Sequence, residues 1–127
     1  MPAIPTPSEA MRRTETPNAV MTTIASPTQG PTSNLSLWKV NMRAGQEGPR
    51  HVFDGEQVWH VVDGEINVTV DDESTQLRRG DAIVLAADVV RQITALADTE
   101  MIVCGRGDAV VYVPGEAGSR GTPPWIS

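Results

Sequence analysis

The only two histidines of the chain, His51 and His60, lie within one short stretch, residues 45–64. Imidazole exchanges a proton near neutral pH and is a common metal ligand, so this stretch is the first candidate for chemistry. Between the histidines lie a short acidic turn and an alternating apolar run that leads to a glycine. This arrangement indicates a binding site inside a small β-barrel.

The elements that must position this stretch are short strands. Turn signals recur about every 6 to 12 residues, and no helical periodicity of useful length interrupts them. About eight to ten short strands of this kind predict an all-β antiparallel sandwich or barrel. The clearest strand of the N-terminal half is 35–42, in which Ser36, Trp38, Val40 and Met42 share one face by alternation.

Two segments are predicted to be buried. The run AIVLA at 82–86 is typical of a strand that is covered on both faces. Cys104 lies within a later strand between apolar neighbours, and we expect it to be an unreactive, buried thiol.

The domain organisation follows from composition along the chain. Residues 1–12 are proline-rich and polar and are predicted to form a flexible arm. Residues 13–127 then form one domain whose core spans 35–113. Within it, 13–25 predicts one or two short strands that pack on the barrel rim or cross onto a partner subunit. Trp125, near the end of an otherwise irregular tail, is expected to cover apolar barrel surface, with a part in closing a pocket as the less favoured alternative.

Length and charge exclude several classes of protein. The 127 residues suit one domain, and 39% hydrophobic residues suffice for a core without disulfide staples. Sixteen acidic against ten basic residues give a net charge of −6, which argues against nucleic-acid binding. No apolar run approaches the roughly 18 residues of a membrane span. A single cysteine and a start without an apolar leader favour the cytoplasm.

The glycine spacing resembles the two signatures of the cupin superfamily. In the first signature Gly45 is followed after five residues by His51, and the stretch closes on Gly64 in register. The second signature begins at Gly80, sixteen residues beyond Gly64, a usual distance between the two. The resemblance covers about residues 35–113 and implies a double-stranded β-helix barrel of jelly-roll type, commonly dimeric.

The resemblance also implies where the family's metal would be held. Of its three histidines and one glutamate, only the first histidine is retained, as His51; the others fall on Phe53, Arg91 and Gln57. A divalent first-row metal needs three or four good ligands, and phenylalanine and guanidinium offer none. We therefore expect no metal cofactor at the usual position, and if one binds, His51 and Gln57 hold it. The second signature's proline, glycine and asparagine fall on Ala86, Asp88 and Ala95.

The inward positions carried over from the family form a small-molecule pocket. In it we expect His51 to act as general acid/base, Arg91 to hold an anion or a developing enolate, and Gln57 to orient the substrate. If Gln57 and Trp59 point inward, then His60 points outward by alternation. The further positions expected to contact substrate are Phe53, Trp59, Trp38, Met42 and Met101.

Three functions follow from this pocket. The favoured one is a metal-independent isomerase, cyclase or lyase acting on a small anionic or carbonyl-bearing substrate, as among the small single-domain cupins of secondary metabolism. The second is a ligand-binding or sensory cupin without chemistry. The third is a metal-dependent oxygenase in which His51, Gln57 and an acid such as Glu56 or Asp54 form a shifted ligand set.

Each of these side chains also has a purely structural interpretation. His51 could be hydrogen-bonded to backbone as a remnant of a metal site, and Gln57 could satisfy a backbone group. Arg91 could form an ion pair with one of three nearby acids, Asp54, Asp88 or Glu56. Cupins commonly pair through sheet faces, so we expect a homodimer with His60 and Val62 near the contact.

Overall fold

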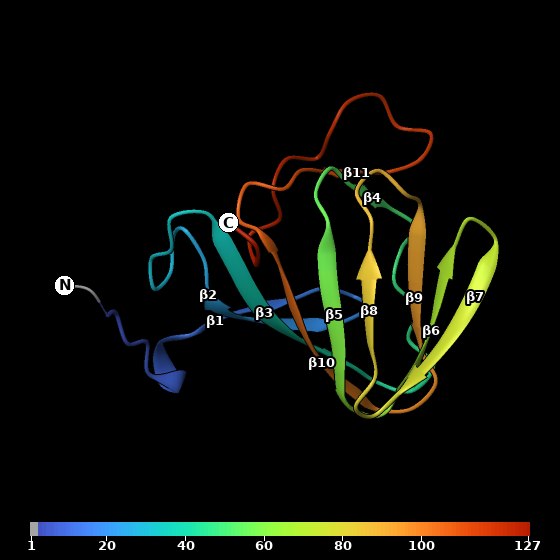
Figure 1. The fold of residues 1–127 in the computed structure, drawn as a ribbon, viewed down its shortest axis with the longest axis horizontal. Helices are drawn as coiled ribbons and strands as arrows, with labels where there is room; N and C mark the ends of the chain where they lie inside the picture. Colours follow the sequence, from blue (N-terminus) through green and yellow to red (C-terminus); the bar gives the residue numbers. More distant parts are fainter. Residues whose placement is uncertain (1–2) are drawn as a thin grey trace.

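The computed structural model describes residues 3–127, and this part of the chain is almost entirely β (Figure 1). One short 3-10 turn, η1 (Ser8–Ala10), precedes eleven strands. No helix in the described part is long and apolar enough to cross a membrane. The strands are β1 (Arg12–Glu15), β2 (Val20–Ala25), β3 (Leu35–Met42), β4 (Val52–Phe53), β5 (Gln57–Asp63), β6 (Glu65–Val70), β7 (Glu73–Arg78), β8 (Ala82–Leu85), β9 (Arg91–Ala95), β10 (Thr99–Arg106) and β11 (Val111–Tyr112).

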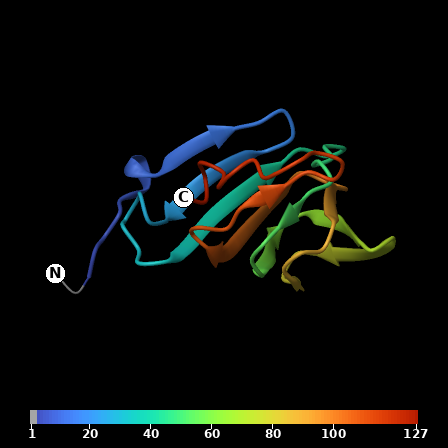
Figure 2. The same ribbon diagram turned by 90° about the horizontal axis from the view of Figure 1, so that it is seen from above.

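The strands form one large sheet and two small ones. The large sheet has the order β1-β2-β3-β10-β5-β8, the second has β7-β6-β9, and β11 pairs with β4. Every pair is antiparallel, and the neighbours β3–β10, β10–β5 and β6–β9 are far apart in sequence. The two larger sheets face each other around the core, and Figures 1 and 2 show β9, β6 and β7 set against the end of the large sheet. This is a jelly-roll arrangement, and the predicted all-β class is confirmed.

Alternation along β3 directs its side chains as predicted. Ser36, Trp38, Val40 and Met42 are buried, whereas the residues between them are exposed or partly exposed. β10 lies next to β3 in the sheet, and its Val103 is paired with Trp38 on one side and Trp59 on the other. These three residues form one inward-facing row across the large sheet.

Two signature positions at which the family has glycine lie in tight turns between strands. Gly64, between β5 and β6, has φ +96°, and a Cβ there would collide with the Asp98 carbonyl oxygen and with Thr99 Oγ1. Only glycine fits both the angle and the space. Asp88, which stands at the position of the second signature's glycine, has φ 67°. Aspartate is among the residues that tolerate this left-handed region best.

Two predictions of burial are wrong. β8 is an edge of the large sheet and only one of its faces is covered, so Leu85 is buried whereas Val84 is 60% exposed. Cys104 is exposed because its neighbour Val103 takes the inward position on β10. A strand that is covered on one face buries every second residue only.

The N-terminal segment packs on its own barrel. β1 and β2 form a hairpin, and β2 pairs with β3, where Thr23 lies opposite Trp38. The hairpin extends the large sheet, which is the first of the two expected placements. β1 begins at Arg12, one residue before the predicted domain start. Of the predicted arm, residues 1 and 2 lie outside the described residues.

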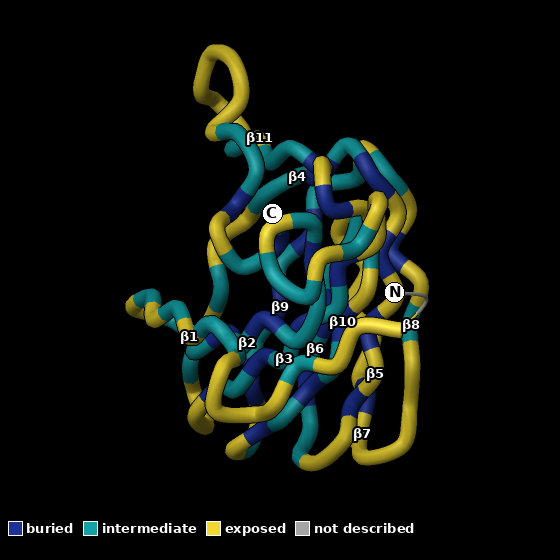
Figure 3. Tube along the Cα trace, turned by 90° about the vertical axis from the view of Figure 1, so that its left-hand side faces the viewer, coloured by how far each residue is buried: buried dark blue, intermediate teal, exposed yellow. Residues whose placement is uncertain are grey.

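The C-terminal tail returns to the β1–β2 hairpin and covers the core there (Figure 2). Ile126 is fully buried, and Trp125 packs against the core, as predicted. Thr23 Oγ1 donates to the Trp125 carbonyl oxygen (2.8 Å), and Ser26 Oγ donates to that of Ser127 (2.9 Å). The loop between β11 and this anchored segment is exposed (Figure 3).

Candidate functional site

The central cavity of the barrel has a volume of about 310 Å³ and is lined mainly by apolar and aromatic side chains. All three tryptophans of the chain, Trp38, Trp59 and Trp125, line it. Four of the predicted substrate-contacting residues, namely Trp38, Met42, Phe53 and Trp59, lie in its wall, together with His51 and Gln57. The cavity therefore gathers most of the predicted pocket.

Two predicted site residues lie behind the wall of this cavity rather than in it. Met101 is fully buried on β10, between Val40 of β3 and Val61 of β5, and does not line the cavity. Arg91 also lies outside the lining, at the start of β9, and reaches the cavity through its contacts with Gln57 and Phe53. Met101 is thus placed as a core residue, and Arg91 as a residue behind the site.

Gln57 has a defined amide orientation. Its Oε1 accepts two hydrogen bonds, from Arg91 Nη2 at 2.7 Å and from Trp59 Nε1 at 3.1 Å. Both partners can only donate, so the atom that receives them must be the oxygen. The amide nitrogen Nε2 is buried and has no hydrogen-bond partner in residues 3–127. Gln57 is therefore a residue of the cavity lining whose amide has N–H donors without a partner.

Arg91 is a buried cation without a carboxylate partner. Its side chain is 1% exposed, its guanidinium carbon lies 4.6 Å from the Phe53 ring centroid, and its Nε has no partner among the described residues. Burial lowers the pKa of Arg91 to about 10, so that it stays protonated at neutral pH. The proposed structural ion pair is not formed. Asp54 instead pairs with Arg106 at 3.3 Å, and no ion pair within the described chain includes Arg91.

His51 and Arg91 are held next to each other by the backbone. Each donates its N–H to the other's carbonyl oxygen, at 3.1 and 3.0 Å, in an isolated antiparallel bridge. The His51 ring meets Phe53 edge-on, with 5.3 Å between centroids, and its Nδ1 lies 2.7 Å from the Pro49 carbonyl oxygen. That oxygen can only accept, so we assign the proton to Nδ1, which leaves Nε2 as the acceptor.

The charge state of His51 differs from the prediction. Burial, and then the charge of Arg91, lower its pKa from 6.5 to about 4, against the opposing effect of the hydrogen bond with Pro49. At neutral pH the ring is therefore neutral and a weak base. In the protein without a ligand, His51 does not exchange a proton near pH 7, contrary to the prediction. The hydrogen bond to backbone that the structural interpretation of His51 expects is present, between Nδ1 and the Pro49 carbonyl oxygen.

The residues at the family's metal position do not fit a divalent cation. Gln57 Oε1 has two lone pairs, and both face N–H donors, so the amide has no lone pair left for a metal. The Arg91 cation stands where the family has its third histidine, and it repels a second positive charge. Within residues 3–127, no group of three or more His, Cys, Asp or Glu side chains is placed so that it could hold a metal ion. We therefore derive no step through a metal at this position.

Comparison with known proteins agrees with this fold. A family model described as "Cupin domain" matches residues 38–104, more than half of the chain. The chain belongs to the cupin family. A search among curated proteins gives no match.

Solved structures with the same fold are remote in sequence. An RmlC-like cupin from Shewanella frigidimarina is 22% identical (TM-score 0.69; 80% of this chain, 87% of that one), and KdgF from Halomonas is 23% identical (0.66; 75% and 86%). A salicylate 1,2-dioxygenase from Pseudoaminobacter salicylatoxidans is 21% identical (0.71; 85% of this cupin, 32% of the dioxygenase chain). At these identities the likeness shows the jelly-roll barrel and nothing finer.

Sequence reasoning missed one wall of the cavity of this cupin. Met21 of β2, Ile93 of β9, the loop 16–19 and Arg120 belong to the lining as well. Trp125 of the tail also lines the cavity, which agrees with the less favoured of the two expectations for this residue. The tail has no periodic pattern from which the direction of the Trp125 side chain could be predicted. The one available signal was the apolar pair Trp125–Ile126 at the end of a polar segment.

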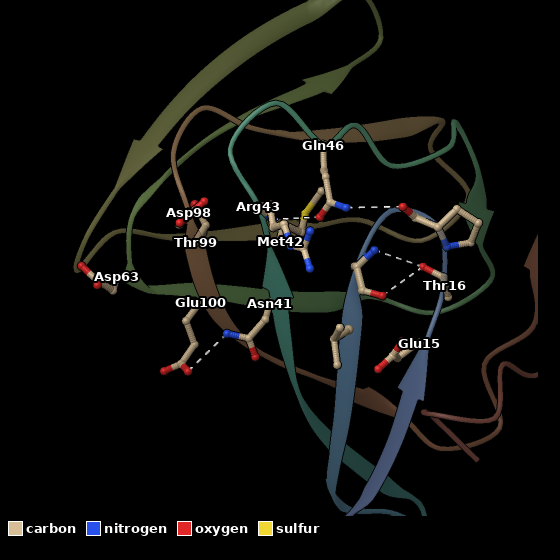
Figure 4. Close-up of a pocket in the computed structure, with 13 residues that line it drawn as sticks. Glu15, Thr16, Asn41, Met42, Arg43, Gln46, Asp63, Asp98, Thr99 and Glu100 are labelled. Atoms are coloured by element: carbon tan, nitrogen blue, oxygen red, sulfur yellow. Dashed lines mark hydrogen bonds between the residues drawn. The ribbon is translucent and has the colours of Figure 1, made fainter.

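A second, more open hollow lies at the C-terminal end of β3, beside the β1–β2 turn, and shares Met42 with the central cavity (Figure 4). Its volume is about 650 Å³, and Glu15, Asp63, Asp98 and Glu100 make its lining acidic. Several of its polar groups are bonded within the protein, such as Asn41 Nδ2 to Glu100 Oε1 at 3.4 Å. No buried polar side-chain atom without a partner is found in this lining, so we assign no site to it.

Proposed function

We propose that this cupin binds a small, mostly apolar organic molecule in its central cavity, through an oxygen atom of the ligand that Gln57 recognises. The observation that carries the proposal is the Gln57 amide. Its orientation is fixed by Arg91 and Trp59, and its N–H donors have no partner. An unpaired buried donor is unfavourable, and a ligand oxygen seated against it removes that cost.

The size and lining of the cavity support a small ligand. A cavity of about 310 Å³ is at the lower end of the range for small-molecule sites. Its walls carry three tryptophans and Phe53, whose flat faces suit an aromatic ring or a compact hydrocarbon. A few polar groups among apolar walls orient a ligand, as is usual in such sites.

A second candidate function is metal-independent proton transfer, in an isomerase, cyclase or lyase. It is favoured by the assigned tautomer of His51, in which Nδ1–H faces the Pro49 carbonyl oxygen and Nε2 is the acceptor nitrogen. Arg91, acting through Gln57, would stabilise negative charge that develops on a substrate oxygen. In this reading the cupin returns an altered molecule, whereas a sensory or carrier cupin returns the ligand unchanged.

The test is to identify what the purified protein carries. Native mass spectrometry, followed by chromatography of the denatured sample, should detect one small organic molecule per chain, and Trp38→Phe with Gln57→Leu should lose it. If the purified protein carries no organic molecule and also takes up none that is added, the proposal is contradicted. For the catalytic version, incubation of the recovered ligand with fresh protein should produce an isomer or fragment, and His51→Ala should slow this by at least about a hundredfold.

We also propose that the protein is a cytoplasmic homodimer. His60 and Val62 face outward from β5 as expected, and Val58, Val62 and Val84 leave apolar surface on the large sheet. A second copy packed on this face would cover that surface. A solution mass of 13.6 kDa, that of a single chain, would contradict the dimer.

A further inference from the structure

We infer that the cavity selects an organic anion, such as a carboxylate or a comparable oxyanion, over a neutral molecule of the same shape, because Arg91 supplies a buried positive charge behind Gln57. The inference rests on the proposed function. It decides between the anionic and the carbonyl-bearing ligands that the sequence left open.

The first step concerns the charge itself. A buried guanidinium is normally matched by a carboxylate, because an unmatched buried charge is strongly unfavourable. Within residues 3–127, Arg91 has only the Gln57 oxygen and the face of Phe53 as partners, and its Nε has none. A neutral amide and an aromatic face offset part of the cost. The positive charge of Arg91 is therefore only partly compensated within the protein.

The second step is how that charge reaches a ligand. Arg91 Nη2 donates to Gln57 Oε1, and Gln57, whose Nε2 donors have no partner, is one of the residues that line the cavity. Hydrogen bonds in series polarise one another, so a guanidinium on the oxygen makes the amide N–H a stronger donor. An anionic acceptor gains both from this polarisation and from the charge of Arg91, whereas a neutral acceptor gains mainly from the first.

The third step is that no acidic side chain lines the central cavity. The chain has sixteen acidic residues, yet none of the residues that line the cavity is an aspartate or a glutamate. The one arginine in the lining, Arg120, is paired with Glu116. The charge buried beside the cavity, that of Arg91, is thus positive, while the protein as a whole carries −6.

The experiment compares pairs of probes that differ only in charge: benzoate with benzamide, and phenylacetate with phenylacetamide. Affinities are measured by calorimetry at one fixed ionic strength, and tryptophan fluorescence shows that each probe enters the cavity, since all three tryptophans line it. We expect the carboxylate of each pair to bind about tenfold or more tightly than its amide.

Two variants assign this preference to the Arg91–Gln57 pair. Arg91→Met should reduce the preference to about one, whereas Arg79→Met, which removes an exposed cation elsewhere, should leave it unchanged. Gln57→Glu places a carboxylate against Arg91 and should reverse the preference, because the amide probe can donate to Glu whereas benzoate is repelled. If Arg91→Met does not fold, Arg91→Lys replaces it; this variant keeps the charge and should keep the preference for the carboxylate probes. The reversal of the preference by Gln57→Glu then tests the inference.

The outcomes separate the two proposals. Equal affinities within each pair would overturn the selection of anions and leave the binding of small molecules standing. A preference that persists in Gln57→Glu would also overturn it, since the charge would then come from elsewhere. Failure of all four probes to bind would overturn the proposed binding function, and the inference with it.

Discussion

Arg91 Nη2 donates to Gln57 Oε1 at 2.7 Å, across the space between β9 and β5. In the family these two positions hold a histidine and a glutamate that share a metal. In this chain a permanent cation replaces the histidine, and a neutral amide replaces the glutamate. With the bond from Trp59, the bond from Arg91 occupies both lone pairs of Gln57 Oε1, so that none is left for a metal ion. The positive charge of the site therefore belongs to the Arg91 side chain, which lies behind the wall of the cavity.

The first prediction concerns the cost of that charge. Arg91→Met removes a buried cation that has no carboxylate partner, and Gln57 Oε1 keeps its bond from Trp59. We expect the free energy of unfolding to stay the same or to rise by about 1–3 kcal/mol, in urea denaturation at pH 7. A loss of more than about 3 kcal/mol would mean that Arg91 is a structural anchor rather than a functional charge.

The second prediction is a dependence of stability on pH that arises from His51. Its pKa in the folded protein, about 4, lies below the ordinary value of 6.5. The unfolded chain therefore binds more protons between these values, and stability present above pH 6.5 is lost as the pH falls towards 4. The contribution is about 1–3 kcal/mol.

Urea denaturation of the wild type and of His51→Gln at pH 7 and pH 4.5 measures this contribution. The variant should lose less stability than the wild type over the interval. His60→Gln, which removes the exposed histidine, is the matched control and should behave as the wild type. Parallel losses in all three proteins would place the pH dependence on other groups.

The third prediction concerns Gly105, which lies between Ser36 and Gln57 in the large sheet. A Cβ at this position would lie 3.2 Å from Gln57 Cγ, a tight contact that displaces the Gln57 side chain. Gly105→Ala should therefore weaken ligand binding at least about fivefold, at a cost in stability of about 1–3 kcal/mol. Gly118→Ala, in the exposed loop, is the control for binding. Unchanged affinity in Gly105→Ala would argue against recognition through Gln57.

The fourth prediction concerns the tail. Trp125→Ala removes one wall of the cavity while Ile126 stays buried as an anchor. Benzoate affinity, measured by calorimetry, should fall by about tenfold, because the removed ring closes the apolar part of the site. Tyr112→Ala removes an exposed aromatic residue outside the cavity and should have no effect on binding. An unchanged affinity in Trp125→Ala would make the tail a structural cover only.

The sequence predicts those parts of the fold that depend on local pattern. The alternation in β3 and β5 places Trp38, Gln57 and Trp59 inward, and the glycine spacing places the turn at Gly64. Burial of β8 is mispredicted because whether a strand lies at the edge of a sheet depends on pairing with distant strands. The failure at Cys104 is different, because apolar neighbours in sequence lie on the opposite face of a strand.

The site follows the same division. The pocket positions are recognisable because they lie in register with family signatures. The bond between Arg91 and Gln57 is not, because it depends on how far apart two sheets sit and on which rotamers fill the space between them. Trp125 could not be aimed at the cavity for a related reason, since hydrogen bonds from Thr23 and Ser26, about a hundred residues away, hold the tail.

The most direct test of the account is a crystal structure of the protein with benzoate, with anomalous data collected for transition metals. We predict a carboxylate oxygen within about 2.7–3.2 Å of Gln57 Nε2, the phenyl ring among the tryptophans, and the Arg91–Gln57 bond intact. A metal ion bound by His51, or benzoate seated outside the central cavity, would contradict the account.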